Sequence, residues 1–241
     1  MAPIVEVLAS KEALIQRAAV LMEEKIRLAI ETRGRCSLAL AGGSTPKPLY
    51  ANLAEASLPW EQLHCFWGDE RYVPADHPDS NEGMARKAWL DQVPIPASNI
   101  HPMPTLSGDP AVDAATYNDH LDRFFAVTGQ DFPVFDIILL GLGDDGHTAS
   151  LFPHTPALEV CDRSVTVGNK DGQPRLTFTI PLINTARSVI FLVAGENKRP
   201  ALKAIFQTEK DPTLDRQYPA RFIRPQGELL WLLDAAAGEP T

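Results

Sequence analysis

The chain has 241 residues and a formal net charge of −9, with 44% hydrophobic and 22% charged residues. This is an ordinary globular composition that can support a sizeable core. Nucleic acids and anionic membranes are bound by basic surfaces, so the acidic charge argues against either as a main partner. It does not exclude a local basic pocket for a small anion.

The sequence carries no sign of export or membrane insertion. Its amino-terminal segment lacks a charged stretch followed by a sustained apolar run, and no apolar run approaches the length of a membrane span. The three cysteines, Cys36, Cys65 and Cys161, form no CxxC pair and so predict neither a zinc site nor a disulfide framework. Cys36 and Cys65 lie beside apolar runs, where we expect them to be buried. We therefore predict a cytoplasmic protein.

The predicted elements alternate along the chain. Helical spacing predicts a helix over residues 10–33, with Ser10 as its N-cap and Gly34 as its stop. Further helical patterns cover residues 79–90, 110–127 and 196–207. Between them lie continuous apolar runs, typical of parallel strands with both faces covered: "CSLALA", "LHCFW", "FDIILL", "SVIFLV" and "ELLWLL".

This alternation predicts an α/β fold of three layers, in which a mostly parallel twisted sheet has helices on both faces, as in Rossmann-like proteins. The sequence contains no low-complexity linker and no repeat, so one domain over residues 1–241 is the simplest division. We expect the segment from Asp211 to Pro225 to be an irregular surface loop that returns to the last strand.

Four polar clusters follow predicted strands. They are "AGGST", "GDERY", "GDDGH" and "AGENKR". Ligands of open parallel sheets bind at the carboxyl ends of the strands. We therefore expect the four clusters to converge on one crevice.

The first cluster has two interpretations. Gly42 and Gly43 allow a tight turn, and Ser44 or Thr45 is placed to cap a helix that begins at Pro46. Free backbone N–H groups at such a helix start can bind an anion. An ordinary capped turn explains the pattern equally well.

The second cluster places Asp69 and Arg71 directly after a strand. At the protein surface such a pair contributes little to stability. At the carboxyl edge of a sheet it offers a carboxylate that can act as a base or orient one, beside a guanidinium that can bind an oxyanion.

The third cluster contains G-x-G-x-x-G at Gly141, Gly143 and Gly146, which suggests dinucleotide binding. Two features oppose that interpretation. Pro153 ends the helical segment within a few residues, and Asp144 and Asp145 would repel a pyrophosphate. We expect instead that the glycines bend the chain so that His147, a general base oriented by Asp145, faces the crevice. The alternative is an aspartate cap and an ordinary polar histidine.

In the fourth cluster Lys198 lies in the first turn of a helix, where a cation opposes the helix dipole. A bound anion would remove this conflict. Arg175 is a further cation, but no local pattern gives it a role. The other histidines lack metal-ligand spacing, so we predict no metal site.

The motifs "LAGGSTPKPLY", "FWGDERYVPADHPDSN", "GLGDDGHTASLFP", "VIFLVAGENKR" and "WLLDAAA" together resemble the 6-phosphogluconolactonase family. This family shares a superfamily and a fold with glucosamine-6-phosphate deaminase. The resemblance implies hydrolysis of 6-phospho-D-glucono-1,5-lactone to 6-phospho-D-gluconate in the oxidative pentose phosphate pathway, without cofactor or metal. It makes the chain a functional neighbour of glucose-6-phosphate dehydrogenase, with no direct binding implied.

Carried over to these residues, the resemblance makes His147 the catalytic histidine, with Asp145 beside it. The aspartate-glutamate-arginine motif of the family falls on residues 69–71. The substrate and phosphate site falls on Gly42, Gly43, Ser44, Thr45 and Lys198, and we place the second phosphate-side arginine at Arg175.

Three alternatives stay open at this point. One is a deaminase or isomerase acting on an amino-sugar phosphate, although such relatives typically carry tyrosine where this chain has Arg71. A second is a sugar-phosphate-binding regulator without catalysis, which intact Asp145 and His147 oppose. The third is a dinucleotide-dependent dehydrogenase.

Overall fold

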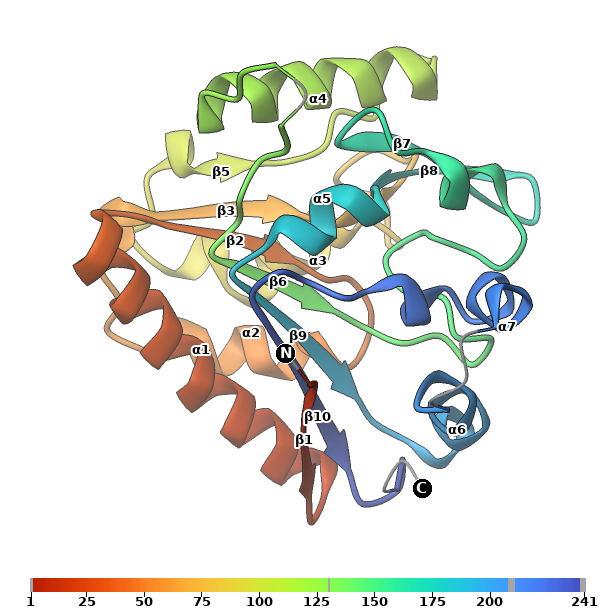
Figure 1. Cartoon of the computed structure of the whole chain (residues 1–241). Helices are drawn as coiled ribbons and strands as arrows, with labels where there is room; N and C mark the ends of the chain where they lie inside the picture. Colours follow the sequence, from red (N-terminus) through yellow and green to blue (C-terminus); the bar gives the residue numbers. More distant parts are fainter. Residues whose placement is uncertain (1, 130, 208–210, 239–241) are drawn as a thin grey trace.

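A computed structural model describes residues 2–129, 131–207 and 211–238 and arranges them in two sheets (Figure 1). The larger sheet has the strand order β1-β10-β9-β6-β2-β3-β5, and every neighbouring pair in it is parallel. Its strands are β1 (Ile4–Leu8), β2 (Cys36–Leu40), β3 (Leu63–Trp67), β5 (Ile100–His101), β6 (Ile137–Leu140), β9 (Ser188–Val193) and β10 (Glu228–Asp234). The predicted mostly parallel α/β sheet is confirmed.

A smaller antiparallel sheet stands beside the carboxyl end of β3. Its strand order is β4-β8-β7, with β4 at Asp69–Arg71, β8 at Gln173–Phe178 and β7 at Val165–Lys170. The amide of Phe178 donates to the carbonyl of Gly68 at 2.8 Å, which ties this sheet to the end of β3. The sequence patterns did not predict it.

The described helices are α1 (Lys11–Arg33), α2 (Pro46–Ala54), α3 (Asn81–Ala88), α4 (Pro110–Phe125), α5 (Ile180–Thr185), α6 (Arg199–Ile205) and α7 (Pro212–Gln217). Helix α1 begins and ends where the sequence predicts. Ser10 accepts a hydrogen bond from the amide of Ala13, and Gly34 adopts the left-handed conformation with φ 77°. None of the described helices is long and apolar enough to cross a membrane.

The helices form layers on the two faces of the large sheet. The connections from β1 to β2, β2 to β3 and β3 to β5 advance in one direction along the sheet, and those after β5 run the other way. Parallel crossovers are right-handed, so the two directions place their helices on opposite faces. In agreement, α1 packs against α2, which packs against α3, whereas α4 lies beside β7 (Figure 1).

The central strands are buried along their whole length. All residues of β2, β6 and β9 are buried, and the apolar side chains of the sheet and helices form a continuous core. Cys36 and Cys65 belong to this core, as predicted, while Cys161 is exposed. Strands covered on both faces have no reason to alternate apolar and polar residues, which accounts for the continuous apolar runs in the sequence.

Strands β2 and β6 are neighbours, but the chain leaves them toward opposite edges of the sheet. The connections that follow their carboxyl ends therefore run apart and leave a crevice between them, the usual ligand site of such sheets.

Two local expectations were wrong. The segment from Asp211 to Pro225 is not irregular throughout, since it contains α7 and a 3₁₀ helix, η6 (Pro219–Phe222), with buried Pro219, Ala220 and Arg221. After His147 there is no helical segment for Pro153 to close. Thr148 and Leu151 form a β-bridge instead, and the next helical turn is η4 (Pro156–Glu159).

Candidate active site

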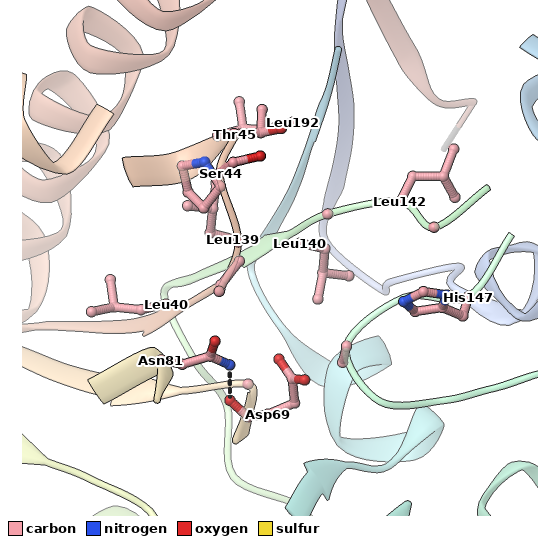
Figure 2. Close-up of a pocket in the computed structure, with 18 of the residues that line it drawn as sticks. Leu40, Ser44, Thr45, Asp69, Asn81, Leu139, Leu140, Leu142, His147 and Leu192 are labelled. Atoms are coloured by element: carbon pink, nitrogen blue, oxygen red, sulfur yellow. Dashed lines mark hydrogen bonds between the residues drawn. The ribbon is translucent and has the colours of Figure 1, made fainter. Parts of the chain in front are cut away.

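A cavity of about 250 Å³ lies at the diverging ends of β2 and β6 (Figure 2). Each of the four predicted clusters contributes to its wall. The residues predicted for the site that line it are Gly42, Gly43, Ser44, Thr45, Asp69, Arg71, His147, Arg175 and Lys198. Asp145 does not line the cavity but contacts His147. The structure therefore brings the predicted residues together.

The loop after β6 is a tight turn that positions His147. The amide of Gly143 donates to the carbonyl of His147 at 2.8 Å, and the amide of Gly146 donates to the carbonyl of Gly143 at 3.0 Å. A Cβ on Gly143 would lie 2.0 Å from Nδ1 of His147. Gly146 has φ 77°, and a Cβ there would lie 2.7 Å from the Tyr218 ring. Gly143 and Gly146 are therefore needed because His147 and Tyr218 occupy the space of their side chains. This packing explains the glycine pattern without a bound dinucleotide.

His147 and Asp145 form a short side-chain contact in the site. Nδ1 of His147 lies 2.5 Å from Oδ1 of Asp145, which also accepts from the backbone amide of His147 at 3.1 Å. Burial raises the pKa of Asp145, but the hydrogen bond and charge of His147 outweigh it and lower the pKa to about 2. An ionised Asp145 favours a proton on Nδ1, which leaves Nε2 unprotonated and able to accept one.

Asp69 is fixed by two neighbours that the sequence motifs did not single out. Its Oδ2 accepts from the Ser150 hydroxyl at 2.6 Å, and its backbone carbonyl accepts from Nδ2 of Asn81 at 2.9 Å (Figure 2). Asn81 packs so closely on Gly42 that a Cβ there would lie 1.8 Å from its Oδ1. The motif "PDSN" contained Asn81, but only the fold reveals this contact.

Glu70 supports the site and does not face it. Its carboxylate accepts from the backbone amides of Arg71, Asn81 and Glu82, at 2.8, 2.7 and 2.7 Å. Burial raises the pKa of Glu70 to about 7 against these hydrogen bonds. The side chain anchors β4 on the start of α3.

Arg71 and Arg175 are cross-strand partners on β4 and β8. Nη1 of Arg71 donates to the carbonyl of Asp79 at 2.6 Å. The Nε atoms of both arginines are buried and have no hydrogen-bond partner in the described chain. Burial and the neighbouring charge of Arg71 lower the pKa of Arg175. Two adjacent guanidinium groups with unused donors are suited to bind an anion. That Arg175 contacts the substrate stays a prediction.

Lys198 lies at the end of a 3₁₀ turn, η5 (Glu196–Lys198), and directly precedes α6. Its Nζ donates to Oδ1 of Asp144, which also accepts from Nδ2 of Asn197 at 2.8 Å. Hydrogen bonds from Lys198 and then Asn197 lower the pKa of Asp144. The unfavourable position of Lys198 at a helix start is thus partly offset by a carboxylate within the protein.

The loop after β2 differs from the expected capped turn. Thr45 occupies the N-cap position of α2 with helical angles, and its side chain makes no capping hydrogen bond. Ser44 is exposed. The hydroxyl groups of this loop are therefore open to a ligand.

Among the residues that the structure describes, no group of three His, Cys, Asp or Glu side chains is arranged to hold a metal ion. That no metal takes part in the reaction stays a prediction.

Comparison with known proteins identifies the family. A family model described as glucosamine-6-phosphate isomerases/6-phosphogluconolactonase matches residues 9–231. The chain belongs to this family.

Its similarity is to the lactonases of the family. A 6-phosphogluconolactonase from Synechocystis sp. is 66% identical over 239 residues, covering 99% of this chain and 98% of the relative. One from Nostoc sp. is 62% identical, covering 97% of this chain and 96% of the relative. The solved structure of 6-phosphogluconolactonase from Trypanosoma cruzi superposes with a TM-score of 0.86 at 34% identity, covering 98% of this chain and 96% of that one.

Proposed function

We propose that the chain hydrolyses 6-phospho-D-glucono-1,5-lactone to 6-phospho-D-gluconate. Its identity to curated 6-phosphogluconolactonases over almost their whole length supports this activity. The observation that carries the mechanism is the His147–Asp145 pair at the wall of a cavity that also contains Arg71, Arg175 and Lys198. A general base beside several cations suits the addition of water to an anionic ester.

In the first step water attacks the lactone carbonyl carbon, and Nε2 of His147 takes a proton from that water. Asp145 orients the ring and stabilises the imidazolium that forms. The carbonyl oxygen becomes an oxyanion, which Arg71 stabilises through its unused donors. The bond to the ring oxygen then breaks, and His147 returns its proton to that oxygen. The product acid ionises and releases one proton.

We assign the 6-phosphate to the part of the cavity wall that Lys198, the loop after β2 and Arg175 form. Lys198, the open loop from Gly42 to Thr45, and Arg175 supply cationic and hydroxyl donors. The phosphate is not part of the ester bond that breaks, so its binding energy positions the substrate. Asp69, fixed by Ser150 and Asn81, is available to a hydroxyl of the sugar ring or to the attacking water.

We further propose that residues 1–241 act as one domain and that the protein works in the cytoplasm. It would be a pathway neighbour of glucose-6-phosphate dehydrogenase without binding it directly. The continuous core that both sheets share supports the one-domain proposal.

The decisive assay is acid release from freshly generated 6-phosphogluconolactone, corrected for spontaneous ring opening. We expect acid release well above the spontaneous rate. Release of ammonia from glucosamine 6-phosphate would favour the deaminase, and binding without turnover would favour the regulator.

The phosphate assignment has its own test. Charge-assisted hydrogen bonds contribute about 1.5–3 kcal/mol each, so Lys198→Ala is expected to lower kcat/KM for the phosphorylated lactone roughly 10- to 100-fold. Hydrolysis of unphosphorylated gluconolactone is expected to change little, and Arg175→Gln is expected to show the same dependence on substrate. Arg199→Ala is the matched control, because Arg199 is the neighbouring cation but does not line the cavity. Equal losses on both lactones would refute the assignment.

A further inference from the structure

We propose that Asp144 sets the affinity of the site for phosphate by competing with it for Lys198. This inference rests on the proposed function, in which Lys198 binds the 6-phosphate of the substrate. In the free protein the lysine is already paired, because its Nζ donates to Oδ1 of Asp144. A phosphate that binds Lys198 must therefore compete with a carboxylate that already neutralises the charge of the lysine.

The two partners differ in how firmly they are held. The side chain of Lys198 is 18% exposed, whereas that of Asp144 is 63% exposed. The amide of Gly195, which opens the turn that carries Lys198, donates to Oδ1 of Asp234 at 3.0 Å. This bond ties the turn to the end of β10. The lysine is thus the fixed partner, and the exposed aspartate is the one that a ligand displaces.

Asn197 strengthens the hold on Asp144. Its Nδ2 donates to the same oxygen that Lys198 contacts, at 2.8 Å. Its Oδ1 lies so close to Gly195, which has φ 105°, that a Cβ there would be 2.8 Å away. The turn therefore presents two donors to one carboxylate oxygen. Both donors become free when phosphate displaces Asp144.

The position of Asp144 in the chain extends the effect to the catalytic loop. Asp144 and Asp145 are adjacent, yet they contact different partners: Asp145 holds the ring of His147, and Asp144 holds Lys198. The second contact joins the loop from Gly141 to His147 to the turn after β9. A ligand that displaces Asp144 from Lys198 releases this contact, so phosphate binding acts on the loop that carries the base.

An exposed ion pair contributes a modest free energy, which limits the size of the effect. Exposed pairs are worth about 0.2–1 kcal/mol, or roughly 1.4- to 5-fold in an equilibrium constant. We expect the upper part of this range, because one oxygen of Asp144 accepts from two donors.

The experiment measures the affinity for inorganic phosphate by calorimetry, which does not depend on turnover, and KM for the phosphorylated lactone. Asp144→Asn is expected to tighten phosphate binding roughly two- to fivefold and to lower KM by a similar factor. This increase in phosphate affinity is expected to vanish when Lys198→Ala is also present, because Asp144 and phosphate then have no lysine to compete for.

The matched control is Asp162→Asn. Asp162 is 66% exposed and paired with Arg163, so its replacement removes a similar charge and a similar ion pair, but Asp162 does not line the cavity. It is expected to leave the phosphate affinity unchanged. If Asp144→Asn leaves it unchanged or weakens it, while Lys198→Ala still weakens it, the competition is refuted. A wild-type protein that releases no acid from the lactone would refute the proposed function instead.

Discussion

Gly143 and His147 depend on each other sterically. The ring of His147 fills the space in which a side chain on residue 143 would lie, 2.0 Å from its Nδ1. The same ring packs on Phe152, with 4.6 Å between ring centroids. A histidine held from two sides and hydrogen-bonded to Asp145 has lost most of its rotational freedom before substrate arrives. This preorganisation is what general-base catalysis requires.

We predict that His147→Ala lowers kcat by about 10²–10⁴-fold, because a positioned general base contributes that much. Asp145→Asn is expected to lose less, since it weakens the orientation of the ring and leaves the base in place. The measurement is acid release at saturating lactone, with the product affinity of each variant measured separately.

Two outcomes would contradict these roles. If His147→Ala keeps more than half of the wild-type kcat, the base lies elsewhere. If Asp145→Asn loses as much as His147→Ala, Asp145 itself accepts the proton.

At the scale of elements, three histidines join β3, β5 and α4. Nδ1 of His64 lies 3.2 Å from Nε2 of His101, whose Nδ1 lies 2.9 Å from Nε2 of His120. The contacts use both nitrogens of His101, so the three rings form a row of hydrogen bonds and not a chelate for one metal. Each hydrogen bond needs one N–H proton, and three neutral imidazoles supply enough protons for both.

This row of three histidines resists protonation. Burial lowers the pKa of all three histidines, and it lowers that of His101 to about 4, with further contributions from His120 and His64. Arg35 adds to the effect on His64, and Arg123 adds to the effect on His120. The folded protein therefore binds fewer protons here than the unfolded chain. The resulting stability is present above pH 6.5 and is lost as the pH falls toward 4.

We predict that the free energy of unfolding decreases between pH 6.5 and pH 4, by up to about 3 kcal/mol from His101 alone. Urea unfolding at a series of pH values measures it. The raised pKa of Glu70 makes the free energy of unfolding increase as the pH falls from 7 to 4.5, which opposes the effect of the histidines. Comparing the wild type with histidine variants, which all retain Glu70, isolates the contribution of the histidines.

His101→Gln removes the titrating imidazole and is expected to make the free energy of unfolding depend less on pH. The control His77→Gln changes an exposed histidine and is expected to leave this pH dependence as in the wild type. The same slope in His101→Gln and wild type would show that the row of three histidines does not govern acid stability.

The elements also show what sequence patterns can and cannot predict. The runs of β2, β6 and β9 are buried on both faces, so their composition alone identifies them as parallel strands. Strand β4 has three polar residues, Asp69 to Arg71, and exists only because β8 pairs with it. The sequence did carry a signal for the β7–β8 hairpin, the dipeptide Asp171-Gly172, which is typical of a two-residue turn. In the structure both residues have the positive φ values that such a turn requires, 53° and 86°.

The site was predictable to the same extent. Residues that follow buried strands, such as His147 and Lys198, can be placed together from strand order. Ser150 and Asn81 cannot, because their contacts with Asp69 join segments 81 and 12 residues apart in the chain. Arg175 faces Arg71 only through a strand pairing that leaves no local pattern.

On the scale of the whole molecule, the site joins segments that are distant in sequence. Its walls come from the ends of β2, β6 and β9 and from the small sheet. A ligand that contacts Ser44, His147, Arg175 and Lys198 therefore connects four parts of the chain. If residues 1–241 form one domain, binding must stabilise all of them together.

We predict that 6-phosphogluconate, the product, shifts a single unfolding transition as a whole. A ligand at 100 times its Kd stabilises the folded state by about 2.7 kcal/mol. For a chain of this size, 1 kcal/mol corresponds to about 2–4 °C in Tm, so we expect an increase of roughly 5–11 °C. Calorimetric scans with and without product measure it, and Lys198→Ala at the same product concentration is expected to shift less because it binds the phosphate more weakly. A transition that splits, with only one part moving, would show that the chain unfolds as more than one unit and would refute the one-domain proposal.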